Sequence, residues 1–273
     1  MKFRSGLLSL VAVLSAGLLV SSAQARTVCT AMADAKTGKV FLQEGQCAER
    51  VTPASTFKIA ISLMGYDAGF LKDEHTPTLP YREGYVDWGG AAWTQPTDPT
   101  RWLEYSVVWF SQQVTHALGP VRFARYAKDF NYGNADVSGD PGKDNGLERS
   151  WIGSSLKISP LEQIAFLTKF VNRQLPVSTT AFDMTSRIVQ TTVLSNGWTV
   201  HGKTGMAYPR QADGTSDEAH AYGWFVGWAV KDGNTVVFAR LIQEDQHESV
   251  TAGVRAREAF LNALPSLLAT RPD

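Results

Sequence analysis

A serine and a lysine stand three positions apart in the sequence S-T-F-K, which occupies residues 55–58. Pro53 and the apolar residues that follow predict a helix over 54–65. Side chains three apart lie on one face of a helix, so the hydroxyl of Ser55 can meet the amine of Lys58. A serine needs such a base to act as a nucleophile, and burial can lower the pKa of a lysine enough for that task. The helix N-terminus also favours negative charge as it develops.

The S-x-x-K spacing is weak evidence when it stands alone, because a chain of this length holds about one such match by chance. A second match runs from Ser154 to Lys157, in a stretch rich in glycine and serine where helical spacing is not expected. Ser55 is therefore the preferred nucleophile. On this motif alone, a Ser55 without a catalytic role remains the alternative.

A second motif, Lys203-Thr204-Gly205, lies at the end of a strand predicted over 198–205. If that strand is at a sheet edge, the glycine permits close backbone approach and the lysine and threonine can bind a carboxylate. The alternative is an ordinary turn after the strand. A given tripeptide is expected by chance on the order of 0.1 times in such a chain, so this motif strengthens the case for a site.

Three further segments are ambiguous when each is taken separately. Ser106-Val107-Val108 falls in a predicted helical region, where its hydroxyl could relay a proton or be an ordinary helix serine. The sequence Y-G-N at 132–134 is typical of a turn in a loop. The segment 151–159, W-I-G-S-S-L-K-I-S, is typical of a loop capped by a buried tryptophan.

Taken in order, these five segments resemble the class D β-lactamases, the oxacillinase family of serine β-lactamases. That family has S-T-F-K, S-x-V, Y-G-N, W-x-x-x-x-L-x-I-S and K-T-G, and all five patterns match between Ser55 and Gly205. The resemblance implies hydrolysis of β-lactam antibiotics through an acyl-enzyme on Ser55. Small-molecule β-lactams are then the expected partners of this chain.

The resemblance also implies that Lys58 is carboxylated on its side-chain nitrogen by carbon dioxide. The modified lysine would be the general base in both acylation and deacylation. Apolar neighbours such as Val108 and Ile152 would keep the amine largely neutral, which uptake of carbon dioxide requires. Trp151 would steady the carbamate through its indole N–H. No other cofactor is implied.

By the same analogy, Ser106 would pass a proton toward the β-lactam nitrogen. Backbone N–H groups of Ser55 and Met206 would form the oxyanion hole. An arginine of the last helix would bind the substrate carboxylate, and Arg257 is preferred over Arg255 because Phe260 and Leu264 then fall on the face behind it. The expected substrate-binding set is Val108, Ile152, Lys203, Thr204, Gly205, Met206 and Arg257.

Three other protein classes are alternatives to a β-lactamase. The stretch from Gly197 to Thr204 fits the P-loop pattern G-x-x-x-x-G-K-[ST], but its interior is strand-like and Pro209 opposes the helix that a P-loop requires. A β-lactam sensor or penicillin-binding protein would share the fold, become acylated and turn over slowly. A structural or adhesive exported protein would not react with a β-lactam.

The elements expected to position these residues are strands at both ends of the chain and helices between them. Strands are predicted over 28–34 and 40–43 as a hairpin, and over 198–205, 220–230 and 235–243, with a turn at 231–234. Helices are predicted over 54–65, 101–118, 120–130, 160–172, 180–194 and 252–268, with a connection over 73–100 and a loop over 131–153. This order indicates an α+β fold, β-lactamase/transpeptidase-like, whose antiparallel sheet joins the N-terminal hairpin to the C-terminal strands.

The N-terminus carries the pattern of a secretory signal peptide over 1–25. Lys2 and Arg4 precede an apolar run over 6–20, and A-Q-A at 23–25 provides a cleavage site after Ala25. A membrane anchor is the alternative, although such a helix needs roughly 20 apolar residues. Residues 26–273 are then expected to form one exported, periplasmic catalytic domain. Its near-neutral charge gives no indication of nucleic-acid or membrane binding.

Cys29 and Cys47 are the only cysteines of the chain and lie at equal distances from residue 38, in the predicted hairpin turn. In an oxidising compartment this arrangement favours a disulfide, with two unpaired thiols as the alternative. The five histidines show no pairing typical of metal ligands, and no metal site is predicted. The sequence carries no indication of an oligomeric state.

Overall fold

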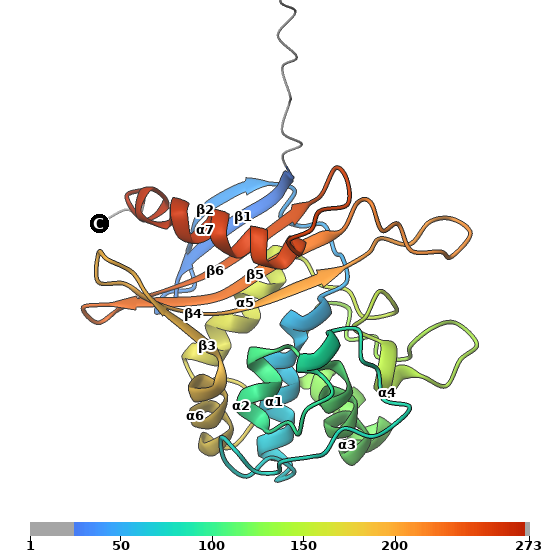
Figure 1. Ribbon diagram of the computed structural model, residues 1–273. Helices are drawn as coiled ribbons and strands as arrows, with labels where there is room; N and C mark the ends of the chain where they lie inside the picture. The colour runs from blue at the N-terminus through green and yellow to red at the C-terminus, as the bar shows by residue number, and fades with distance from the viewer. Residues whose placement is uncertain (1–24, 271–273) are drawn as a thin grey trace, which may run out of the picture.

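The computed structural model describes residues 25–270 (Figure 1). The predicted signal peptide lies outside the described residues except for Ala25. A six-stranded antiparallel sheet spans the molecule in the order β2-β1-β6-β5-β4-β3. The N-terminal hairpin joins the C-terminal strands because β1 pairs with β6, which confirms the predicted α+β fold. The strands are β1 (Arg26–Asp34), β2 (Val40–Gly45), β3 (Gln190–Val193), β4 (Thr199–Ala207), β5 (Tyr222–Lys231) and β6 (Asn234–Gln243).

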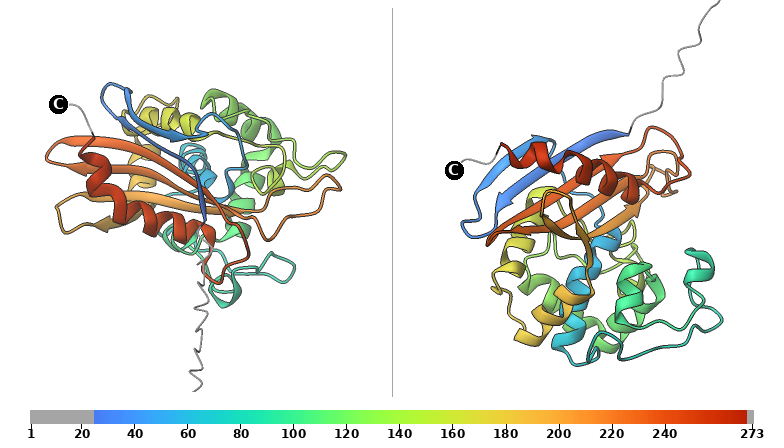
Figure 2. Two further views of the ribbon diagram at one scale, coloured as in Figure 1. Left: turned by 90° about the horizontal axis from the view of Figure 1, so that it is seen from above. Right: turned by 60° about the vertical axis from the view of Figure 1, so that its left-hand side comes forward.

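Both faces of the sheet are covered by helices, so the central strands β5 and β6 are mostly buried on both sides (Figures 1 and 2). The C-terminal helix α7 (Ala252–Leu268) lies across one face, where Phe260 stacks on Phe238 with ring centroids 4.2 Å apart. The opposite face meets α5 (Pro160–Val171) and the helical region. The strongly apolar sequence of β5 follows from this two-sided burial.

The helical region surrounds α1 (Lys58–Asp67), which directly follows the short 3-10 helix η1 (Ala54–Phe57). Every residue from Lys58 to Tyr66 is buried, as expected of a helix that is apolar on all sides. This central position brings the first residues of the helix into the interior of the protein. The remaining helices are η2 (Gly90–Ala92), α2 (Pro99–Glu104), α3 (Val108–Asp129), α4 (Gly146–Arg149) and α6 (Thr179–Ile188).

The helix predicted over 101–118 is wrong at Ser106. Asp98 caps α2 by accepting from the backbone N–H of Arg101, and this helix ends at Glu104. Ser106 then takes a left-handed backbone conformation with φ of 58°, and α3 begins two residues later. The chain therefore turns sharply at Ser106, which connects α2 to α3. The predicted boundary before residue 120 is confirmed as a kink at Gly119, where φ is 72°.

Two other boundaries also differ from prediction. The helix predicted over 180–194 ends at Ile188, and the residues after it form edge strand β3. The β-branched side chains of Thr191, Thr192 and Val193 favour a strand, and β4 supplies the partner. Within the predicted loop 131–153, the four residues of α4 form a single helical turn.

The predicted disulfide between Cys29 and Cys47 is present. The hairpin register differs from the symmetric expectation, because Cys29 lies opposite Gly45 and Cys47 follows the end of β2. Gly45 has a φ of 87°, and a Cβ there would lie 2.2 Å from the carbonyl oxygen of Val28. Only glycine fits this close approach, and it lets the chain turn back so that Cys47 reaches its partner.

Candidate active site

Ser55 and Lys58 meet at the start of the central helix. Ser55 lies in η1 and Lys58 is the first residue of α1. The Lys58 Nζ lies 2.9 Å from the Ser55 Oγ, within hydrogen-bond distance. Ala54, just before the serine, has a left-handed φ of 50°, which costs an alanine free energy and is typical of a constrained functional site. The contact predicted between the Ser55 hydroxyl and the Lys58 amine is therefore formed in the structure.

Lys58 has no exposed surface. Burial, with a further contribution from the charge of Lys203, holds the pKa of Lys58 well below the usual value for a lysine. A largely neutral amine at this position can accept the proton of Ser55, or react with carbon dioxide. The indole of Trp151 is also fully buried, and its Nε1 has no hydrogen-bond partner among the described residues. Trp151 packs on Phe57, the residue before Lys58, with ring centroids 6.1 Å apart.

A second serine–lysine pair is formed by Ser106 and Lys203. The Lys203 Nζ donates to the Ser106 Oγ at 3.1 Å and to the carbonyl oxygen of Thr204 at 3.1 Å. Burial lowers the pKa of Lys203 to about 7, so this amine exchanges its proton readily near neutral pH. The pair can hold and deliver one proton, which is the chemistry that a departing amine requires.

The K-T-G motif lies on a free section of sheet edge. The edge strand β3 pairs with β4 only from Thr199 to Gly202, so the outer side of β4 is not covered by β3 from Lys203 onward. At Gly205, a Cβ would lie 3.0 Å from the carbonyl oxygen of Pro53 and 3.1 Å from the Thr56 side chain. The glycine thus lets β4 pass close to η1, which brings the motif next to Ser55.

A cavity of about 280 Å³ lies between η1, the Ser106 turn and β4. Ser55 and Ser106 both line this cavity. Lys58 and Lys203 do not line it; each is buried and forms a hydrogen bond with one of these serines. A larger cavity of about 600 Å³ lies between α3 and the loop before α4 and contains none of these groups. The lining residues of the first cavity are Ala54, Ser55, Trp88, Gly89, Trp93, Ser106, Val108, Ile152, Thr204, Gly205, Met206, Thr251 and Gly253.

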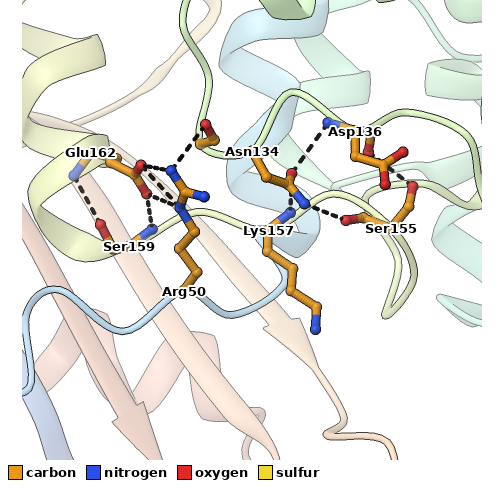
Figure 3. Close-up of polar contacts among 8 residues, drawn as sticks. Arg50, Asn134, Asp136, Ser155, Lys157, Ser159 and Glu162 are labelled. Carbon is orange, nitrogen blue, oxygen red and sulfur yellow. Dashed lines mark hydrogen bonds and ion pairs between the residues drawn. The ribbon is translucent and has the colours of Figure 1, made fainter.

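Asn134 of the Y-G-N motif is hydrogen-bonded to residues 155–157, shortly after Trp151 and Ile152 in the chain (Figure 3). The Asn134 Oδ1 accepts from the backbone N–H groups of Lys157 and Asp136, and its Nδ2 donates to the carbonyl oxygen of Ser155 at 2.8 Å. Gly133 has a φ of 56°, and a Cβ there would lie 2.0 Å from the Lys157 carbonyl oxygen. Gly133 and Asn134 therefore both contact the segment 155–157 of the same chain. The prediction of a simple turn from the sequence did not reveal these contacts.

The same segment is fixed at its end by the start of α5 (Figure 3). Ser159 and Glu162 form a reciprocal capping box, and Arg50 forms an ion pair with the Glu162 carboxylate. The next residue, Gln163, is buried and donates to the Thr56 Oγ1 at 2.9 Å and to the Tyr132 hydroxyl at 3.2 Å. Sequence reasoning missed Gln163, although the buried face of the helix predicted over 160–172 contains its position.

The structure separates the arginines of α7 from the cavity lining. Arg257 donates to the Thr192 Oγ1 on β3 at 2.9 Å, and Phe260 and Leu264 are buried as expected behind it. Arg255 pairs instead with the carboxylates of Glu244 at 3.4 Å and Glu248 at 3.1 Å. Neither arginine is among the residues that line the cavity. The role of Arg257 in substrate binding therefore stays a prediction.

The competing motifs lack the geometry that they require. Ser154 and Lys157 lie outside any helix, so the second S-x-x-K has no helical spacing. The P-loop match continues into strand β4, and no helix follows it. Within residues 25–270, no group of three potential His, Cys, Asp or Glu ligands is placed to hold a metal ion. In the same range, no helix combines the length and hydropathy needed to cross a bilayer.

The fold and the site together define a serine enzyme of the penicillin-recognising kind. Residues 28–265 match the family described as the penicillin-binding protein transpeptidase domain. The β-lactamase OXA-9 of Klebsiella pneumoniae is 44% identical over 269 residues, covering 97% of this chain and 98% of that protein. OXA-1 of Escherichia coli is 36% identical, covering 88% and 84%. The crystal structure of the class D β-lactamase OXA-427 matches with a TM-score of 0.83 and 46% identity, covering 88% and 98%.

The chain belongs to the class D serine β-lactamases. This conclusion agrees with the resemblance carried by the five motifs. It also explains why the two serine–lysine pairs, the K-T-G edge and the Trp151 segment meet at one cavity.

Proposed function

We propose that this enzyme hydrolyses β-lactam antibiotics through an ester on Ser55. The observation that carries the proposal is the pair of serine–lysine contacts, Lys58 with Ser55 at 2.9 Å and Lys203 with Ser106 at 3.1 Å. One pair is suited to take a proton from the nucleophile. The other is suited to give a proton to the leaving nitrogen. Both serines face the same cavity, so one bound molecule can meet both.

Acylation then moves one proton at each end of the bond that breaks. The Lys58 side chain, in the carbamate form argued for below, accepts the proton of Ser55 as the Oγ bonds to the lactam carbonyl carbon. The negative charge on the carbonyl oxygen is stabilised by the backbone N–H groups of Ser55 and Met206. As the ring C–N bond breaks, Ser106 donates its proton to the nitrogen and recovers one from Lys203. Thr204 and Gly205 border the substrate along the free edge of β4.

Deacylation needs a base that can activate water next to the ester. The residues around Lys58 suit a carbamate on its Nζ, because the amine is buried and its pKa is lowered, while Trp151 offers a buried N–H that has no hydrogen-bond partner within residues 25–270. Such a carbamate supplies a carboxylate base for both halves of the reaction. Trp151 would hold it by donating from the Nε1. Val108 and Ile152 line the cavity nearby and limit access of bulk water.

The test is turnover of a chromogenic β-lactam by residues 26–273 in bicarbonate buffer, with Ser55→Ala as the matched control. Many turnovers per enzyme, lost in the variant, support the proposal. A single burst followed by an ester that persists for hours would instead assign the chain to the sensors or penicillin-binding proteins. No reaction with any β-lactam would overturn the proposal.

Export to the periplasm is part of the same proposal. Removal of residues 1–25 would leave 26–273 as one catalytic domain, in a compartment where the Cys29–Cys47 disulfide is stable. N-terminal sequencing of the enzyme recovered from a periplasmic extract tests this point. The expected first residue is Arg26, and an intact N-terminus in the membrane fraction would contradict cleavage.

A further inference from the structure

Gln163 carries the one side-chain amide that is buried among residues 25–270. It lies on α5, and its amide contacts the 3-10 helix η1 that holds Ser55. An amide is costly to remove from water unless new hydrogen bonds replace those that it loses, and an apolar side chain would avoid this cost. None of the five motifs includes Gln163, and the proposed reaction does not use it. The contacts of this amide are therefore a place to look for a further role.

The hydrogen bonds of the Gln163 amide run in one direction. Its Nε2 donates to the Thr56 Oγ1 at 2.9 Å and to the Tyr132 hydroxyl at 3.2 Å, which uses both protons of the NH₂ group. Thr56 gives its own hydroxyl proton to the carbonyl oxygen of Pro53 at 2.7 Å. The Thr56 oxygen can then only accept from Gln163, so the amide nitrogen must face it. The bonds therefore lead from Gln163 through Thr56 to Pro53.

Pro53 and Thr56 are the two ends of a tight turn that contains the nucleophile. The Pro53 carbonyl oxygen also accepts the backbone N–H of Thr56 at 3.2 Å, which closes the turn. Inside it, Ala54 has the left-handed φ of 50°, which an alanine keeps only where its surroundings impose it. The peptide group after Ala54 supplies the backbone N–H of Ser55, one of the two N–H groups proposed for the oxyanion hole. The hydrogen bond from Gln163 thus acts on the turn that aims this N–H.

The same turn also lies directly against strand β4. A Cβ at Gly205 would lie 3.0 Å from the Pro53 carbonyl oxygen and 3.2 Å from the Thr56 backbone nitrogen. Met206, the next residue of that strand, supplies the other N–H group proposed for the oxyanion hole. The position of the turn against β4 therefore sets the distance between the two N–H groups, and a shift of the turn would separate them.

We propose that Gln163 is a positioning residue whose amide holds this turn, so that the backbone N–H of Ser55 stays aimed at the carbonyl oxygen of a bound β-lactam. The inference rests on the proposed function and adds to it a residue that does not line the cavity. Without the amide, Ala54 can relax toward an ordinary φ, and the N–H of Ser55 then turns away. The side chains that line the cavity are unchanged, so the substrate still binds while acylation slows.

The test uses Gln163→Met, which keeps a side chain of similar length but makes no hydrogen bond to Thr56. Rapid mixing with a chromogenic β-lactam over a range of concentrations separates the limiting acylation rate from the Kd of the first complex. The limiting rate is expected to fall by about 10- to 100-fold, as for a small misplacement of a group that acts in the transition state. The Kd is expected to change by less than about twofold. A wild-type limiting rate in the folded variant would overturn the inference.

Thr56→Val breaks the same series of hydrogen bonds one step later and keeps a β-branched side chain. It should slow acylation as Gln163→Met does. The double variant should be about as slow as the slower single variant, because the second substitution removes a contact that is already lost. Effects that multiply in the double variant would overturn the inference. If Gln163→Met does not fold, Thr56→Val decides alone, and a wild-type limiting rate in it would overturn the inference.

Thr185→Val is the matched control, because it removes another buried hydrogen bond at the central helix α1, the 2.8 Å contact with Ser62. Urea unfolding is expected to show a loss of stability comparable to that of Gln163→Met, whereas acylation should keep the wild-type rate. An equal decrease in the limiting rate of both variants would show that lost stability alone slows acylation, which overturns the inference and leaves the proposed function intact. A wild-type enzyme that reacts with no β-lactam would instead overturn the proposed function and this inference with it.

Discussion

Lys203 and Ser106 are 97 positions apart in the chain, yet the lysine amine lies 3.1 Å from the serine hydroxyl. The contact depends on two backbone features, the left-handed φ of 58° at Ser106 and the free edge of β4 beyond Gly202. It joins the helical region to the sheet across the cavity. The proton delivery that we propose for Ser106 and Lys203 would therefore depend on how these two halves of the fold pack together.

The first prediction concerns that contact. Ser106→Ala removes the group that we propose donates a proton to the leaving nitrogen, so acylation is expected to slow by roughly 10²–10⁴-fold. Rapid-mixing measurement of acyl-enzyme formation with a chromogenic β-lactam checks this. Ser266→Ala, on the exposed side of α7, is the control and should acylate at the wild-type rate. Wild-type acylation in Ser106→Ala would show that the leaving nitrogen takes its proton elsewhere.

The second prediction concerns stability against pH. Burial lowers the pKa of Lys203 to about 7, and that of Lys58 is also lowered, whereas both lysines titrate at their ordinary values in the unfolded chain. Between pH 7 and 9.5 the unfolded chain therefore binds more protons, and the free energy of unfolding rises with pH. Burial raises the pKa of Tyr126 to about 12. Buried tyrosine therefore makes the free energy of unfolding fall with pH, but only from about pH 10 upward, where tyrosines of the unfolded chain ionise.

Urea unfolding at pH 7.0, 8.25 and 9.5 and constant ionic strength measures this slope. Lys203→Met removes one of the two lysines and should make the slope smaller. A free energy of unfolding that falls over this range in the wild-type enzyme would contradict the burial of neutral lysines.

The third prediction concerns Trp151. Trp151→Phe keeps an aromatic ring in the core but removes the buried N–H, and the smaller ring is expected to lower stability by about 1–3 kcal/mol. If that N–H holds a carbamate on Lys58, the variant should need more bicarbonate to reach its maximal rate. The check is kcat across a bicarbonate series, together with carbon NMR of enzyme in labelled bicarbonate. A wild-type enzyme without a carbamate signal at neutral pH would exclude the carboxylated lysine.

The fourth prediction concerns the Y-G-N motif. Asn134→Ala releases the backbone at 155–157, so the segment with Trp151 and Ile152 is expected to shift and kcat to fall about tenfold. Asn134 is exposed, so its lost hydrogen bonds should lower stability by only about 1 kcal/mol. Lys157→Ala is the control, because Lys157 takes part through its backbone N–H. Equal kinetics for both variants would exclude a positioning role for Asn134.

The fifth prediction separates the two arginines of α7. If Arg257 binds the substrate carboxylate, Arg257→Ala should raise KM by roughly tenfold or more, as expected for loss of a charged hydrogen bond. Arg255→Ala should instead lower stability by about 1–3 kcal/mol, because it leaves the buried Glu244 carboxylate without its cation. Steady-state kinetics and urea unfolding of both variants decide the assignment. An unchanged KM in Arg257→Ala would count against the prediction.

Much of the local structure could be predicted because its causes are local. The apolar runs, the turn at 231–234 and the Pro160 helix start each follow from neighbouring residues, and the structure confirms them. The prediction failed where a tertiary partner changed the outcome. Residues 190–193 form a strand because β4 lies beside them, although the pattern up to residue 194 indicated helix. Ser106 lies outside any helix because α2 ends at Glu104 and the backbone takes a left-handed conformation at Ser106, which the apolar pattern did not reveal.

The sequence by itself determined the chemical groups of this enzyme and their order along the chain. A serine and a lysine three positions apart meet wherever the backbone turns helically, so their contact required no distant information. Only the tertiary structure decided which distant groups join them, namely Lys203 at Ser106, Gln163 behind Thr56 and Trp88 at the cavity. The physical reason is that burial and long-range contacts depend on how helices and sheet pack, and a linear pattern does not specify this packing.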